Sequence, residues 1–168
     1  MKNNKIHDLI VMAIMTAIVL VGQVAMGFLP NIEIVTLLFI LYTLVLGSKV
    51  FVIIYAFVLL EGLVYGFGMW WMNYLYVWTV QAIITLFFRK QTGTLFWCVV
   101  SGIYGLTFGT LCSIPYFFIN GPAGGLAYIV SGIPFDITHC IGNVVICLAL
   151  FKPLKYIIEK GMKFCFSA

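Results

Sequence analysis

Apolar residues form six long runs along the chain, separated by short connections containing glycine, proline, asparagine or lysine. Most runs approach the roughly 20 residues that a helix needs to cross a bilayer, although the second is short. The pattern predicts an all-α, polytopic integral membrane protein. We expect one domain over residues 1–168, a compact bundle of six transmembrane helices. The predicted spans are 8–29, 32–47, 50–68, 72–88, 95–118 and 125–151, with an interfacial C-terminal tail over 152–168.

Composition strengthens this interpretation. The chain is 64% hydrophobic and 8% charged over 168 residues, whereas a soluble domain is about 25% charged. A domain of this size cannot bury so much apolar surface, so lipid must cover most of it. The first apolar run, Leu9 to Leu29, is too long for a typical signal-peptide core and lacks an A-x-A site, so we expect it to remain as a span.

The basic residues are distributed asymmetrically. With six crossings, all nine fall on the same side of the membrane: Lys2, Lys5, Lys49, Arg89, Lys90, Lys152, Lys155, Lys160 and Lys163. The positive-inside rule then predicts that both termini are cytoplasmic. We expect a multi-pass protein of a bacterial plasma membrane. The basic excess therefore carries topological information, and we expect no nucleic-acid partner.

A polar stripe lies within the last span. At 100° per residue, Asp136, His139 and Asn143 fall within about 60° of one another on a helix, and Gly132 extends the stripe. Burying an ionised group in hydrocarbon costs several kcal/mol, so the stripe should point into the bundle.

Two other spans offer matching polar and aromatic faces. Tyr74, Trp78, Gln81 and Thr85 follow helical spacing after Trp70 and Trp71, and the third span contributes Glu61 and Tyr65. We expect an outward-opening pocket in which carboxylates and aromatic walls suit a cationic or amine-bearing ring. The predicted substrate-binding residues are Glu33, Glu61, Tyr65, Trp70, Trp71, Tyr74, Trp78, Gln81, Asp136, His139 and Asn143.

Structural roles are the alternative for several of these residues. Asp136 and His139 could satisfy each other between two helices, and Glu33 could stabilise a helix N-terminus. Trp70 and Trp71, and with them Tyr74 and Trp78, could belong to an interfacial aromatic belt.

Motifs for catalysis and redox chemistry are missing from the sequence. No G-x-S-x-G or H-E-x-x-H pattern occurs, so we do not expect an enzyme. The cysteines form no C-x-x-C pair, and we assign them no redox or metal role: Cys98, Cys112, Cys140, Cys147 and Cys165. We expect neither a cofactor nor a metal.

Uphill transport would need energy from elsewhere. No P-loop occurs, and the two halves of the chain share no convincing repeat of the kind that alternating-access carriers contain. Ala13 and Ala17 lie one turn apart, and such a small-x-x-x-small pair lets another helix approach closely.

The chain resembles the substrate-binding S component of an energy-coupling factor (ECF) transporter. The resemblance is in the six short spans, the cytoplasmic termini, the Ala13-x-x-x-Ala17 motif and the stretch Pro134-Phe-Asp-Ile-Thr-His-Cys-Ile-Gly-Asn143. It implies high-affinity capture of a small water-soluble micronutrient, such as a vitamin, from outside. It also implies association with a transmembrane coupling subunit and two ATPase subunits for ATP-driven import. By the same resemblance, Ala13 and Ala17 contact the coupling subunit, and the connection from Phe28 to Glu33 gates the site.

Two other hypotheses stay open. The chain could be a stand-alone ion-coupled carrier in which Asp136 and His139 relay protons. It could also be an intramembrane enzyme or a structural partner of another membrane complex.

Overall fold

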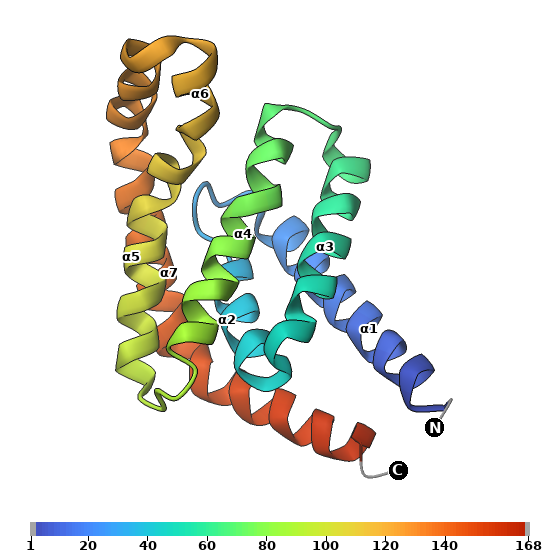
Figure 1. Cartoon of the computed structure of the whole chain (residues 1–168). Coiled ribbons are helices and arrows are strands. Elements are labelled where there is room, and N and C mark those ends of the chain that lie inside the picture. Colours follow the sequence, from blue (N-terminus) through green and yellow to red (C-terminus); the bar gives the residue numbers. More distant parts are fainter. Residues whose placement is uncertain (1–2, 167–168) are drawn as a thin grey trace.

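The computed structural model describes residues 3–166, and the side chains of residues 6–163. No strand occurs within these residues, which confirms the all-α prediction. The elements are α1 (Asn3–Met26), α2 (Val35–Leu46), the 3-10 turn η1 (Gly47–Lys49), α3 (Val50–Tyr65), α4 (Met69–Phe87), α5 (Thr94–Cys112), α6 (Ile114–Ile119) and α7 (Gly121–Phe166). Both ends of the chain, η1 and the α4–α5 turn lie towards the same end of the molecule (Figure 1).

Four stretches of the described chain are long and apolar enough to cross a membrane: Ile6–Met26, Val35–Tyr65, Thr94–Ile119 and Gly121–Lys163. They are compatible with a multi-pass membrane protein. The second stretch contains two helices, because the chain reverses at Gly47, whose φ of 60° suits glycine. Helix α4 is not among the four, since its aromatic residues, Asn73 and Gln81 lower its mean hydropathy. The six crossings and the cytoplasmic termini remain predictions.

Helix α2 is short because other helices surround it. It has 12 residues, and every side chain from Val35 to Thr43 is buried. Its Phe39 ring meets Phe57 and Trp78 edge-to-face, at centroid distances of 5.5 and 5.4 Å, in the middle of the main hydrophobic core. A helix enclosed in this way does not need the length of one that faces lipid.

Helix α7 departs from the predicted boundaries. It continues for 46 residues, so the predicted span 125–151 and the tail as far as Phe166 form one helix. Figure 1 shows its last part turning to run beneath α2 and α3, where Leu154 and Ile158 pack against the core. Pro153 accounts for the turn, because its ring lacks an N–H and clashes with the carbonyl one turn earlier.

The predicted span 95–118 is also divided. Helix α5 ends at Cys112, and the separate helix α6 begins at Ile114 with Pro115 in its first turn. Proline is well tolerated there, where its missing N–H has no helical partner to lose.

Glycines on α5 let α7 approach closely. A Cβ atom at Gly102 would lie 2.6 Å from the Val144 side chain, and one at Gly105 would lie 2.9 Å from the carbonyl of His139. A Cβ atom at Gly109 would lie 2.6 Å from a carboxylate oxygen of Asp136. The spacing of these glycines places them along one side of α5, so the small-residue stripe fixes how close the polar face of α7 lies.

Substitution Gly105→Ala tests this packing. The added methyl group meets rigid backbone, and we expect it to reduce the free energy of unfolding by about 1–3 kcal/mol. Gly132→Ala is the matched control, because a Cβ atom there has nothing within 4 Å. Thermal unfolding of the purified variants should show a loss for Gly105→Ala and none for Gly132→Ala; equal stabilities would contradict the packing argument.

Candidate functional site

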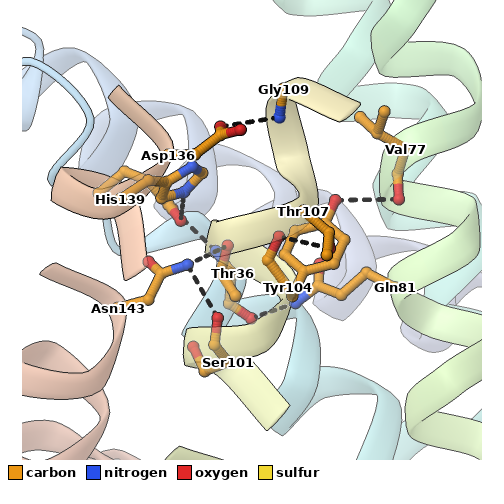
Figure 2. Close-up of polar contacts among 11 residues, drawn as sticks. Thr36, Val77, Gln81, Ser101, Tyr104, Thr107, Gly109, Asp136, His139 and Asn143 are labelled. Atoms are coloured by element: carbon orange, nitrogen blue, oxygen red, sulfur yellow. Dashed lines mark hydrogen bonds and ion pairs between the residues drawn. The ribbon is translucent and has the colours of Figure 1, made fainter. Parts of the chain in front are cut away.

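Asp136 is held at the contact between α7 and α5. Its carboxylate accepts a hydrogen bond of 2.9 Å from the backbone nitrogen of Gly109, as Figure 2 shows. A side chain at position 109 would occupy the space of the carboxylate, so the glycine and the acid form a unit. The side chain of Asp136 also borders a cavity of about 300 Å³ between α5 and α7, together with Phe108 and Tyr128.

His139 is paired with Glu33, one of the acids expected at the site. The imidazole Nε2 lies 3.2 Å from Glu33 Oε1, which is an ion pair when the ring is protonated and a hydrogen bond otherwise. The other carboxylate oxygen of Glu33 accepts a 2.8 Å bond from the backbone nitrogen of Thr36, in the first turn of α2. Glu33 therefore stabilises the start of α2 with one carboxylate oxygen and contacts His139 with the other. Its substrate-binding role stays a prediction.

The connection between α1 and α2 lies over these groups. Asn31 takes a positive φ of 58°, which asparagine tolerates better than most residues. Its backbone and that of Ile32 rest against Gly142 of α7, where a Cβ atom would lie 3.4 Å from the Asn31 oxygen. The connection lies away from the end of the molecule that holds both termini (Figure 1).

A cavity of about 190 Å³ lies beside this connection. Its aromatic wall comes from Tyr74, Trp78 and Phe108, and its polar groups include Glu33 and His139. The Phe108 ring meets the imidazole edge-on at a centroid distance of 4.9 Å. The indole Nε1 of Trp78 is buried and donates to no group of the described chain. A buried donor of this kind costs free energy unless a guest or water accepts from it.

Glu61 borders an adjoining cavity of about 290 Å³. This cavity is lined by Tyr65, Trp70 and Tyr74, and by Gln23 and Gly27 of α1 and its C-terminal end. Glu61 is 2% exposed, and its Oε1 atom has no hydrogen-bond partner among the described residues.

The three cavities follow one another around the α1–α2 connection. The two smaller ones share Gln23, Gly27 and Tyr74, while Asn31 and Phe108 border both the 190 Å³ cavity and the one beside Asp136. The carboxylates of Glu33, Glu61 and Asp136 each border one of these three cavities. We call the three cavities together the composite site, and its walls are aromatic.

A second group of predicted residues lies deeper and is joined by hydrogen bonds between helices. Gln81 Nε2 donates to the Thr36 carbonyl at 2.6 Å. Asn143 Nδ2 donates to the Ser101 carbonyl at 3.3 Å and lies 3.5 Å from the Thr36 hydroxyl. Figure 2 shows this group near Asp136 and His139. Asn143 and Gln81 hold α2, α4, α5 and α7 together, and neither borders the three cavities.

Two aromatic residues from the predicted set have separate environments. Trp70 borders the Glu61 cavity and meets Tyr74 at a centroid distance of 5.2 Å. Trp71 donates instead to the Val58 carbonyl at 2.8 Å, and this bond joins α4 to α3. The Trp71 ring also packs against Phe67. Trp71 is thus placed as a link between helices.

Several cavity residues were missing from the sequence prediction. Phe108 and Gly109 come from α5, a span to which no site residue was assigned. The spacing of Gly102, Gly105 and Gly109 is the signal that could have identified that face. Gln23 stands in an apolar run, and its polarity alone marks it.

Metal-ligating side chains do not gather in groups of three or more within the described residues. Cys98, Cys112, Cys140 and Cys147 carry free thiols, and Cys165 lies outside the residues whose side chains are described. Comparisons with protein-family models, curated proteins and solved structures found no match to this chain.

Substitutions of Glu33 separate its two contacts. Glu33→Ala removes the acceptor for the Thr36 nitrogen, and we expect a loss of about 0.5–2 kcal/mol in the free energy of unfolding. Glu33→Gln retains a side-chain oxygen at the same reach and should lose less. Chemical denaturation of both variants checks the order; an Ala variant as stable as the Gln variant would exclude the helix-terminus role.

Proposed function

We propose that the chain is the substrate-binding subunit of an ATP-driven importer, similar to an ECF S component. It would capture a small water-soluble micronutrient, a cationic or amine-bearing heterocycle, in the composite site around the α1–α2 connection. Transport would then require a transmembrane coupling subunit and two ATPase subunits, which the resemblance implies.

The observation that carries the proposal is a buried carboxylate with an unused acceptor at the edge of a cavity. Glu61 is 2% exposed and its Oε1 atom has no partner among the described residues, while Tyr74 and Trp70 form the adjacent wall. A buried unpaired carboxylate is costly, and a guest with a positive charge or an N–H group would offset that cost. Aromatic faces beside it add cation–π attraction.

The arrangement favours binding over a proton relay. His139 contacts Glu33, and Asp136 contacts a backbone nitrogen. The deeper group consists of amides and hydroxyls, with Gln81 and Asn143 as its largest members. No amide or hydroxyl side chain of this deeper group titrates near neutral pH, so the group offers no ionisable residue to continue a relay from Asp136 and His139.

Helix α1 supports the docking part of the proposal. Ala13 and Ala17 are exposed on its outer face, next to the exposed Ile14 and Ile18. A small-residue stripe flanked by apolar side chains suits close contact with another membrane helix.

Glu61→Gln tests the binding site. Native mass spectrometry of the gently purified full chain should identify the molecule that travels with it, and thiamine is the first cationic heterocycle to add as a probe. Loss of the charged contact should weaken binding of an identified cationic guest by about tenfold or more, as judged by thermal-shift titration.

Glu159→Gln is the matched control, because it makes the same charge change on the exposed tail. Equal affinity of the Glu61 and Glu159 variants would contradict the role of Glu61. A clear thermal shift with acidic vitamins and none with cationic ones would overturn the substrate class.

Ala13→Leu combined with Ala17→Leu tests the docking contact. Bulky side chains should keep a coupling-subunit helix away, so we expect co-purification with that subunit to fall severalfold while guest binding persists. Ala25→Leu is the control, since Ala25 is exposed near the other end of α1. Complex formation unchanged by the double substitution would contradict the assignment.

A further inference from the structure

A groove between α4 and α5 is separate from the composite site. Its volume is about 400 Å³. Its polar wall residues donate hydrogen bonds to backbone carbonyls: Tyr104 to Val77, Thr107 to Ile103, and Gln81 Nε2 to Thr36. The other amide atom, Gln81 Oε1, is buried and has no hydrogen-bond partner among the described residues. The remaining wall is apolar: Ile40, Val80, Ile84, Phe88, Phe96, Val99, Val100, Ile103 and Leu111.

The groove faces outward along most of α5. Val99 and Ile103 line it and are 51% and 57% exposed. On α5 the lining extends from Phe96 to Leu111, about 22 Å at the helical rise of 1.5 Å per residue. That length is at least half the roughly 30 Å hydrocarbon thickness of a bilayer. The groove is thus long enough for an acyl chain from one leaflet.

Positive charge stands at one end of this groove. Phe88 and Phe96 line the end nearest the α4–α5 turn, and Arg89 and Lys90 follow Phe88 directly and are exposed. The Trp97 indole donates to the Gln91 carbonyl at 3.1 Å, which anchors the turn.

Arg89 and Lys90 lack the acidic partners that Lys49 and Lys155 have. Lys49 contacts Asp8 at 2.6 Å, and Lys155 contacts Glu159 at 3.8 Å. Among the side chains that the structure describes, neither Arg89 nor Lys90 takes part in an ion pair. Their charge is therefore free to meet an anion from outside the chain.

We propose that the groove and the α4–α5 turn together bind an anionic phospholipid. One acyl chain lies between α4 and α5, and the phosphate-containing headgroup meets Arg89 and Lys90. An apolar groove alone would suit a neutral lipid or an apolar partner helix, and the unpaired cations at its end are what select an anionic lipid. This site goes beyond the proposed function and does not depend on it.

The experiment uses the purified full chain in nanodiscs of equal parts phosphatidylglycerol and phosphatidylcholine with identical acyl chains. Native mass spectrometry after release measures which lipid is retained. We expect phosphatidylglycerol to be retained preferentially, and Arg89→Gln combined with Lys90→Gln to reduce that preference roughly tenfold. Lys152→Gln combined with Lys163→Gln is the control with the same charge change on the tail, and it should leave the preference unchanged.

Filling the groove tests the acyl-chain seat separately. Val99→Phe should reduce retention of both lipids severalfold, whereas Val145→Phe makes the same change at an exposed position of α7 and should have no effect. Thermal unfolding confirms that the variants are folded, and Ile103→Phe replaces Val99→Phe if that variant fails to fold.

Three results would overturn the proposal. Equal retention of the two lipids would exclude selection by charge. Displacement of phosphatidylglycerol by glycerol 3-phosphate, together with no effect of Val99→Phe, would indicate a site for a free phosphate. A dimer without bound lipid, dissociated by Val99→Phe, would assign the groove to a second copy of the chain.

Discussion

The close contact between α5 and α7 is the constraint from which the rest of the site follows. Glycines at 102, 105 and 109 remove the side chains that would otherwise separate the two helices. Asp136 can then accept from a backbone nitrogen of α5, and the carbonyl of His139 lies against Gly105. In a bilayer, where lipid tails compete equally well for apolar surface, packing of this kind supplies much of what joins helices.

The helical class and the apolar runs could be predicted from the sequence because lipid imposes a simple rule on length and polarity. The helix boundaries could be predicted less well from the sequence. A proline can stand in the first turn of a new helix, as Pro115 does in α6, or bend a continuing helix, as Pro153 does in α7. Which of the two occurs depends on the packing around each proline, and the sequence alone does not give that packing. The burial of α2 could not be predicted either, because a short apolar segment has the same sequence pattern whether protein or lipid covers it.

The site was predicted in part, for a related reason. Helical spacing correctly grouped Asp136, His139 and Asn143 on an inward face, because periodicity reports direction. Helical spacing does not indicate how deeply a side chain is buried, or which residue about 100 positions away it contacts. The sequence therefore could not tell that His139 meets Glu33, or that Asn143 and Gln81 bind backbone carbonyls of other helices. Unpartnered atoms such as Glu61 Oε1 and Trp78 Nε1 can be recognised only once every neighbour is placed.

The uninterrupted length of α7 has a mechanical consequence. Asp136 and His139 lie on the same helix as the basic segment after Pro153. About 20–25 Å of helix, at 1.5 Å per residue, separates the two side chains from Pro153. A partner that holds that segment would therefore also fix the position of one wall of the cavities. The segment after Pro153 and the α7 residues that border the cavities therefore belong to one continuous helix, which is bent at Pro153.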